Sequence, residues 1–516
     1  MSQTGSLETL RGLLEEQARR IPRSTACRFE DVEIDYAGFN AAVDRVGAAL
    51  HGLGVSKGDR VVIGMPNHLD MLVLFFAVAK LGAINVFLNP AYHAELLRRL
   101  VSTISPKAMV LDEATLDKLD ERSPGSPIRI VWPEKRSEAA DMGYRDLAAA
   151  DAGRLPQVDI SPGDPVQFIF TSGTTGLPKA CILSHRARLA LCKHINRCFD
   201  ATDEDCYLGC LPNYHGNVFL GLISSMLVGG CFALLPKFSA SRYWDEVRRH
   251  NASILVLHLV PANILLNSPP DRRDRGHRVR GLFTVGGRIA EFLERFGVRT
   301  GLASYGSTEA GGLVSLAPVT HEEAAAKPSS YGGKVRDDME VCIVDEHDQP
   351  LPYGETGEII VRPRVPHVLF SGYSGQPEQT MQVCRNFWFH TGDLGVLSEN
   401  GDLVFMGRAR ESIRVKGAFV PVEYIESLIR QHDSVTECAL VGVPSKLGEQ
   451  EIKAFIQPRS GFTLRESDII EYLRERIPKS MLPASVEFVT DFPRAAATLK
   501  IQKNRLVAPQ EVSSAG

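Results

Sequence analysis

The stretch Val166-Gln-Phe-Ile-Phe-Thr-Ser-Gly-Thr-Thr-Gly-Leu-Pro-Lys179 joins an apolar run to a loop of glycines and hydroxyl residues that ends at a lysine. Glycines let backbone N–H groups approach an anion closely, hydroxyls add donors, and the lysine supplies positive charge. The spacing differs from the Walker A pattern, because Gly173 and Gly176 are closer and a proline precedes the lysine. We predict a phosphate-binding loop that follows a buried strand. A flexible surface turn is the alternative.

The sequence around this stretch alternates between helical and strand patterns. Apolar residues recur with helical spacing at 7–20, 39–53 and 67–81, and short apolar runs occupy 60–64 and 83–88. Such alternation predicts βαβ units and a mostly parallel sheet. The most apolar segment, 71–88, is interrupted by Lys80 and falls short of the roughly 20 apolar residues of a membrane span. We therefore expect a buried helix followed by a buried strand there.

The last hundred residues have an alternation of their own. A charged segment at 407–411 precedes expected helices at 422–431 and 466–476 and expected strands at 437–443 and 452–457. About 100 residues suffice for a separate small domain. We therefore expect a large α/β N-terminal domain over 1–409, with mixed or parallel sheets layered with helices, and a small α+β C-terminal domain over 410–516.

Composition excludes several classes of protein. The 516 residues are 44% hydrophobic and 23% charged, which is typical of globular chains. The net charge of −4 gives no electrostatic reason to bind nucleic acid or an anionic membrane. Ten scattered cysteines without a CxxC pair indicate free thiols in a reducing compartment. Residues 1–10 lack the basic and apolar regions of a signal peptide, so we expect a cytoplasmic protein.

Several further short motifs are informative only in combination. Tyr305-Gly-Ser-Thr-Glu309 offers a hydroxyl and a carboxylate that could hold Mg²⁺ and a phosphate, although such a pair alone is more often a helix N-cap. The aspartate of Phe389-His-Thr-Gly-Asp393 could accept two ribose hydroxyls, and alone it would suggest an Asx turn. Three more motifs complete the set. Val285-Gly-Gly-Arg288 lies upstream of Tyr305, and Gly407-Arg408 and Thr498-Leu-Lys500 lie downstream of Asp393.

In this order the motifs closely resemble those of the adenylate-forming superfamily, and among its branches those of the AMP-forming acyl-CoA synthetases. The resemblance covers roughly residues 25–506. The segments 354–361 and 371–378 resemble further blocks of structural character in that family. A member of this family would consist of a large N-terminal domain and a mobile C-terminal domain that carries a catalytic lysine.

The resemblance implies a role for each matching residue. The residues that would bind phosphate are Thr171, Ser172, Gly173, Thr174, Thr175, Gly176, Lys179 and Thr308. Glu309 would bind Mg²⁺, and the adenine would contact Gly286, Gly287 and Tyr305. Asp393 and Arg408 would contact the ribose. Lys416 and Gly417 belong to the loop that approaches AMP and the pantetheine tunnel, Arg410 is the hinge, and Lys500 stabilises charge during adenylation. Lysine 500 is preferred over Lys503 because Ile501 and Gln502 match the residues after the family lysine.

The implied activity has two steps. A carboxylic acid and Mg·ATP give an acyl adenylate and pyrophosphate, and the acyl group then passes to coenzyme A with release of AMP. The pair Tyr214-His215 resembles the residues that gate the acyl pocket of CoA ligases, with a satisfied core histidine as the alternative. Gly306, Gly311 and Gly312 would leave room beside it for a bulky or medium to long apolar carboxylate. The alternative is that Gly311 and Gly312 only serve a turn.

Three positions depart from the family pattern. Leu499 replaces the usual glycine before the catalytic lysine, Arg410 replaces Asp or Lys at the hinge, and Phe419 replaces Gln or Asn in the loop near AMP. Phe419 cannot hydrogen-bond to AMP as Gln or Asn would, and it lies in the loop that lines the pantetheine tunnel of CoA ligases. A stand-alone enzyme that loads an acyl carrier protein or an amine is therefore the alternative enzyme, and a nucleotide-binding protein with a decayed site is the alternative from another class.

Overall fold

The computed structural model of the chain describes most of its 516 residues. These are residues 7–119, 126–135, 139–151, 153–171, 178–216, 218–284, 288–409, 413–415, 418–420, 422–444, 450–477, 479–494 and 501–507. Their contacts divide the chain into two units, one made of 1–328, 332–340 and 361–389, the other of 329–331, 341–360 and 390–516. The domain boundary expected at 409/410 stays a prediction, because the hinge candidate Arg410 lies outside the described residues.

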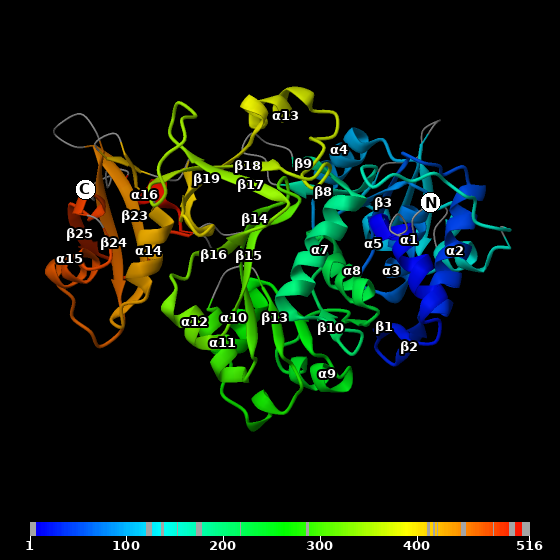
Figure 1. The fold of residues 1–516 in the computed structure, drawn as a ribbon, viewed down its shortest axis with the longest axis horizontal. Coiled ribbons are helices and arrows are strands. Elements are labelled where there is room, and N and C mark those ends of the chain that lie inside the picture. The colour runs from blue at the N-terminus through cyan, green and yellow to red at the C-terminus, as the bar shows by residue number, and fades with distance from the viewer. Residues whose placement is uncertain are drawn as a thin grey trace, which may run out of the picture. The chain divides into compact units, whose positions relative to one another are not determined.

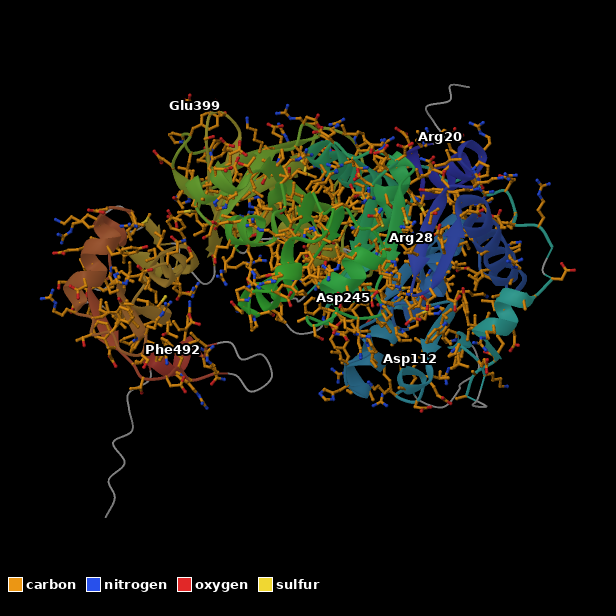
Figure 2. All side chains as sticks on the ribbon, turned by 90° about the horizontal axis from the view of Figure 1, so that it is seen from below. Arg20, Arg28, Asp112, Asp245, Glu399 and Phe492 are labelled. Carbon is orange, nitrogen blue, oxygen red and sulfur yellow. The ribbon has the colours of Figure 1, made fainter. Side chains whose placement is uncertain are left out.

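One sheet of the first unit has seven strands in the order β7-β6-β5-β3-β4-β8-β9. Their bounds are β3 Arg60–Gly64, β4 Ile84–Phe87, β5 Ala108–Asp112, β6 Ile128–Trp132, β7 Met142–Gly143, β8 Pro165–Thr171 and β9 Lys179–Ser184. All neighbours are parallel except β8 and β9. The mostly parallel sheet expected from the alternating patterns is therefore confirmed. Asp112, labelled in Figure 2, ends β5 and accepts a hydrogen bond from the backbone N–H of Thr115.

The second sheet of this unit runs in the order β16-β15-β14-β13-β12-β10-β11-β1-β2. The bounds are β1 Thr25–Phe29, β2 Val32–Asp35, β10 Cys206–Gly209, β11 Cys231–Leu234, β12 Ile254–Val256, β13 Gly281–Phe283, β14 Thr300–Ser307, β15 Gly312–Val319 and β16 Tyr331–Val335. The neighbouring strands β14, β13, β12, β10, β11 and β1 pair in parallel. The strands β2, β15 and β16 pair antiparallel with β1, β14 and β15, respectively. The carboxyl ends of parallel strands are the usual place of ligand sites in such sheets.

Helices cover both sheets and fill the space between them. The bounds are α1 Leu10–Arg20, α2 Tyr36–Gly52, α3 Leu69–Lys80, α4 Ala94–Ile104, α5 Glu113–Leu116, α6 Tyr144–Ala149, α7 His185–Phe199, η2 Asn213–His215, α8 Val218–Val228, α9 Tyr243–Arg249, α10 Leu259–Asn267, η3 Arg272–Arg275, α11 Ile289–Phe296, α12 His321–Ala326, α13 Pro377–Val383 and η4 Arg385–Phe387. Figure 1 shows α7 and α8 between the strands of the two sheets.

The helix α3 is buried on almost every side, as the apolar segment 71–88 predicts. Phe75 of α3 stacks on Phe219 of α8 with ring centroids 4.2 Å apart. Lys80 at the end of α3 is fully buried, and its Nζ lies 2.6 Å from Asp44 Oδ1 and 3.1 Å from Glu15 Oε1. A cation in this core is thus neutralised by two carboxylates, which offsets its loss of hydration.

The second unit contains a smaller α+β part. Strands β17 Met339–Val344, β18 Thr356–Pro363, β19 Phe389–Leu397 and β20 Asp402–Arg408 are neighbours in that order, and β21 Ile413–Val415 pairs with β22 Ala418–Val420. The strands β23 Val435–Pro444, β24 Gln450–Pro458 and β25 Ser485–Phe488 form a three-stranded sheet, accompanied by α14 Val422–Arg430, α15 Glu466–Arg474, η6 Lys479–Met481 and α16 Lys503–Val507.

Phe492, labelled in Figure 2, packs with Ala439, Val441 and Phe455 in the core of the C-terminal part. The expected fold class is confirmed, with a large N-terminal α/β part followed by a smaller α+β part. All ten cysteines are free thiols, as their spacing indicated. Within the described ranges, every helix is too short or too polar to cross a bilayer.

Candidate active site

Glu309 lies at the centre of a cluster built from three distant parts of the first unit. The carboxylate oxygen Oε1 accepts a hydrogen bond from Thr171 Oγ1 and another from Tyr373 Oη, each 3.0 Å long. The Glu309 carbonyl also accepts the N–H of Phe370, at 3.0 Å. Oε2 accepts no hydrogen bond from the described residues, so it is available to a ligand.

The position of Glu309 follows from a tight turn between β14 and β15. Ser307 pairs with Gly312, and the N–H of Gly311 donates to the Thr308 carbonyl at 3.0 Å. The Thr-Glu pair therefore belongs to a hairpin turn and not to a helix N-cap. This turn presents Thr308 and Glu309 directly after β14, whose upstream part pairs in parallel with β13.

The three glycines of this hairpin have backbone reasons for their identity. A Cβ atom on Gly306 would lie 2.0 Å from the Gly312 carbonyl oxygen, and one on Gly311 would lie 2.1 Å from the Val368 carbonyl oxygen. Gly311 and Gly312 also have φ values of +74° and +117°. The turn alternative thus accounts for the last two glycines, and their place in an acyl pocket stays a prediction.

Thr171 and Lys179 face each other where the predicted phosphate loop begins and ends. They are paired residues of β8 and β9, so the loop is closed by a β-ladder. The Lys179 ammonium lies 4.9 Å from the centre of the Tyr373 ring, within the range of a cation–π contact. Between them, the phosphate-loop residues Ser172, Gly173, Thr174, Thr175 and Gly176 lie outside the described residues.

Tyr373 is a site residue that the sequence did not single out as functional. Its backbone forms a bridge with Cys181 of β9, and its N–H donates to Thr380 Oγ1 at 2.9 Å. Burial, and then the Glu309 carboxylate beside it, raise the pKa of Tyr373 far above the ordinary value. The phenol therefore stays protonated and donates to Glu309. The signal in the sequence was its position in the block 371–378, which resembled a purely structural block.

The remaining predicted residues of the first unit belong to β14, to η2 and to a segment outside the described residues. Tyr305 is buried on β14, directly before the hairpin turn. Tyr214 and His215 belong to η2, whose Asn213 is anchored to the Met65 carbonyl at 2.6 Å. Burial raises the pKa of the half-buried Tyr214. The adenine-strand residues Gly286 and Gly287 lie outside the described residues.

The second unit holds the two predicted ribose contacts. Asp393 of β19 and Arg408 of β20 are opposite each other in an antiparallel pair, and their Oδ1 and Nη1 atoms are 2.9 Å apart. Asp393 is buried, whereas the Arg408 side chain is about half exposed. A buried carboxylate with a half-exposed guanidinium beside it suits the recognition of vicinal hydroxyls and a phosphate.

Glu358 of β18 holds the part of β19 that carries Asp393. The carboxylate accepts the N–H of Gly392 through Oε1 and is hydrogen-bonded to His390 Nδ1 through Oε2, both at 3.0 Å. Thr391 Oγ1 donates to the Ile359 carbonyl and accepts the N–H of Asp393. Sequence reasoning treated Glu358 as part of a structural block and His390 as a neighbour of the aspartate, because neither contact is visible without the strand register.

Several predictions fall on residues whose structure is not described. Lys416, Gly417, Arg410, Leu499 and Lys500 are among them. Lys503, the rejected candidate for the catalytic lysine, lies 2.7 Å from Glu426 Oε1 in the C-terminal part. Glu426 is 5% exposed, so Lys503 has a structural partner. This leaves Lys500 as the catalytic candidate, and its role stays a prediction.

Comparison with known proteins identifies the family of this chain. Residues 14–374 match the family model of the AMP-binding enzyme, and residues 424–498 match that of the AMP-binding enzyme C-terminal domain. The chain belongs to the AMP-binding enzyme family. The predicted resemblance to acyl-CoA synthetases is thereby confirmed at the level of the family, and the family's C-terminal model falls within the second unit.

Relatives of this AMP-binding enzyme match over nearly their whole length. The crotonobetaine/carnitine–CoA ligase of Salmonella typhimurium strain LT2 is 29% identical over 514 residues, covering 96% of this chain and 98% of the relative. Apo MatB from Rhodopseudomonas palustris has a TM-score of 0.80 at 26% identity, over 96% and 97% of the two chains. The o-succinylbenzoate CoA synthetase of Bacillus subtilis bound to an acyl-adenylate has a TM-score of 0.75 at 22% identity, over 96% and 98%, and so supports the fold alone.

Proposed function

We propose that this enzyme activates a carboxylic acid with ATP and then transfers the acyl group to coenzyme A. The observation that supports this most directly is the cluster at the ends of β8 and β14, where Thr171, Lys179 and Glu309 meet around Tyr373. Oxygen donors and a lysine at a strand-loop junction suit a nucleotide polyphosphate. The names of the similar CoA ligases agree with this activity.

The first step forms an acyl adenylate. A carboxylate oxygen of the acid attacks the α-phosphorus of ATP, an O–P bond forms, and the bond to the β-phosphate breaks with release of pyrophosphate. Lys179 and the phosphate loop would hold the leaving pyrophosphate, and Lys500 would stabilise charge on the α-phosphate. Asp393 and Arg408 would hold the ribose.

Mg²⁺ fits the residues around Glu309. Its carboxylate is fixed through Oε1 by two hydroxyl donors, which leaves Oε2 as a hard oxygen ligand of the kind Mg²⁺ prefers. When bound, the ion supplies positive charge that neutralises the phosphates. The hydroxyls of Thr171 and Tyr373 orient the carboxylate so that its second oxygen points away from them.

The second step transfers the acyl group to a thiol. The sulfur attacks the carbonyl carbon of the acyl adenylate, the C–O bond to AMP breaks, and the thiol proton passes to solvent. Coenzyme A is the proposed acceptor, because the curated relatives that match over 96% of the chain are CoA ligases. Phe419 in β22 favours the alternative of a carrier-protein thiol or an amine, because its ring cannot hydrogen-bond to AMP as Gln or Asn would.

The bulky or extended apolar acid expected from the sequence rests on Gly311 and Gly312, whose conformations the turn already explains. That expectation stays a prediction, as does a cytoplasmic location.

A panel of carboxylic acids tests the proposed function. Pyrophosphate release with Mg·ATP is measured for short, long, aryl, dicarboxylic and amino acids, with and without coenzyme A. We expect release that depends on one class of acid, and an acyl-CoA product only when coenzyme A is present. Acid-dependent release without that product would support carrier loading. ATP binding without release for any acid would support a decayed site.

A further inference from the structure

Arg188 is a buried cation that has no carboxylate partner among the described residues. The fourth residue of α7, it is 2% exposed, and its Nη2 donates to the Gly216 carbonyl at 2.7 Å. Its Nε is buried and has no hydrogen-bond partner in the part of the chain that the structure describes. Burial lowers the pKa of Arg188 to about 10, and the groups that oppose this shift are the thiols of Cys192 and Cys181. The guanidinium is therefore charged at neutral pH.

Two other buried cations of this unit are paired with carboxylates. Lys80 lies against Asp44 and Glu15, and the equally buried Arg336 is bound by both carboxylate oxygens of Asp338. An unpaired buried charge costs several kcal/mol, so proteins rarely retain one without a use. Arg188 thus differs from Lys80 and Arg336, and this difference points to a bound anionic ligand as its partner.

Gln167 of β8 is a second unpaired polar group at the same place. It is fully buried, and within the described ranges neither its Oε1 nor its Nε2 has a hydrogen-bond partner. A Cβ atom on Gly216 would lie 3.7 Å from Gln167 Nε2, and the Gly216 carbonyl receives Arg188. The side chains of Arg188 and Gln167 therefore both lie beside Gly216, immediately after the predicted acyl-gate residues of η2, and each has one donor group without a partner among the described residues.

The strand β8 connects this place to the reactive centre. Side chains two residues apart point to the same face of a strand, so Gln167, Ile169 and Thr171 share one face. Thr171 is bonded to Glu309, and Ile169 Cδ1 would lie 2.5 Å from a Cβ atom on Gly216. At about 3.3 Å per residue, Gln167 lies roughly 13 Å along the strand from Thr171.

We propose that Arg188 and Gln167 form a polar subsite that receives a second carboxylate at the far end of the acid substrate. The carboxylate would accept hydrogen bonds from Arg188 Nε and Gln167 Nε2, which are the donors left unpaired. This inference rests on the proposed function and narrows it from any carboxylic acid to a dicarboxylic one. A wholly apolar acid would leave the guanidinium unpaired.

Matched pairs of acids test the subsite. For each chain length, kcat and KM for pyrophosphate release by the full chain are compared between a monocarboxylic acid and the α,ω-dicarboxylic acid, at constant Mg·ATP. We expect the wild type to favour the diacid. Arg188→Met and Gln167→Met should each lower kcat/KM for the diacid, by about 10- to 100-fold for Arg188 because it makes a charge-assisted hydrogen bond. Monoacids should change by less than about twofold.

Lys193→Met is the matched control. Lys193 lies on the same helix but is exposed, so its substitution removes a positive charge without touching Gly216. It should leave the preference for diacids unchanged. Thermal stabilisation of the full chain by the preferred diacid, measured without ATP, reports the subsite independently of catalysis and should be lost in Arg188→Met.

Three results would overturn the inference. A wild type that favours monoacids, with no stabilisation by any diacid, would mean that the subsite does not bind a carboxylate. Equal losses for monoacids and diacids together with a higher KM for ATP would mean that Arg188 meets a nucleotide phosphate instead. If Arg188→Met only lowers stability and Gln167→Met leaves selectivity intact, Arg188 merely anchors Gly216. Failure of every acid to support release, with diacid stabilisation retained, would reject the proposed function but keep the subsite.

Discussion

At the scale of single residues, the Glu309 carboxylate shows how neighbouring hydroxyls orient a ligand oxygen. Thr171 and Tyr373 both donate to Oε1, so neither competes for Oε2. Tyr373 is the stronger candidate for fixing the carboxylate, because its ring is also held by Lys179 and its backbone is anchored to β9. Removal of its hydroxyl should therefore affect the use of Mg·ATP.

We expect Tyr373→Phe to lower kcat/KM for Mg·ATP by about tenfold, since a hydrogen bond to a charged group contributes about 1.5–3 kcal/mol. Steady-state kinetics with varied Mg·ATP measures this, and the exposed Tyr353→Phe serves as the control. An unchanged KM for Mg·ATP and an unchanged requirement for Mg²⁺ would show that the phenol does not orient Glu309.

Glu358 is expected to act through Asp393 without touching the nucleotide. In Glu358→Gln the amide could still accept the N–H of Gly392, but its NH₂ group would face His390 Nδ1. The segment of β19 around Asp393 would be held less firmly, so the KM for ATP should rise by about fivefold while kcat changes little. Glu399→Gln, at the exposed position labelled in Figure 2, is the control. A fall in kcat at constant KM would contradict this positioning role.

At the scale of elements, the β14–β15 hairpin depends on a close approach of backbone to backbone. We expect Gly311→Ala to lower the free energy of unfolding by about 2–4 kcal/mol, because the added methyl would overlap the Val368 carbonyl. Gly58 has a similar φ of +85° and nothing within 4 Å of an added Cβ atom. Gly58→Ala in denaturant unfolding therefore measures the cost of the backbone conformation alone, and an equal loss in both variants would rule out the overlap.

The contact between α1 and α7 should make stability depend on pH. The N–H of Leu10 donates to Nδ1 of the fully buried His185, and burial lowers the pKa of this histidine to about 4. The unfolded chain binds the proton more readily, so this contribution is complete above pH 6.5 and is lost as the pH falls toward 4. We expect the loss to reach about 3 kcal/mol.

Denaturant unfolding between pH 7 and pH 4 measures this dependence. His185→Gln keeps an acceptor for Leu10 but does not titrate in this range, so its stability should fall less steeply between pH 6.5 and 4. Parallel curves for the wild type and the variant would assign the dependence to other groups, among them the neighbouring Asp164.

Sequence patterns predicted most elements but few of their connections. The strand at 60–64 and the helix at 67–81 correspond to β3 and α3, because burial imposes a clear periodicity there. The turn at 308–311 was predicted only as an alternative interpretation of Gly311 and Gly312, because the residues against it, Val368 and Phe370, lie far along the chain. Tyr373 and Glu358 were missed as functional residues for the same reason, since their partners are set by strand pairing.

At the scale of the whole molecule, the proposed reaction has two chemical steps, and the resemblance assigns Lys500 to the first of them. We expect Lys500→Ala to reduce acyl-adenylate formation by several orders of magnitude, and thiol transfer from pre-made acyl adenylate far less, because the lysine acts on the α-phosphate only in the first step. Single-turnover measurement of both half-reactions tests this. Equal losses in the two half-reactions would contradict the assignment.

The order in which the chain is synthesised bears on the Glu309 cluster. Thr171 precedes Glu309 by 138 residues, and Tyr373 follows it by 64. At ribosomal rates of about 5–20 residues per second, roughly 3–13 s separate the synthesis of Glu309 from that of its second donor. During this interval the growing chain already contains the strands of both sheets from β1 to β15. A nascent chain could thus form most of both sheets before Tyr373, whose hydroxyl orients the Glu309 carboxylate, has been synthesised.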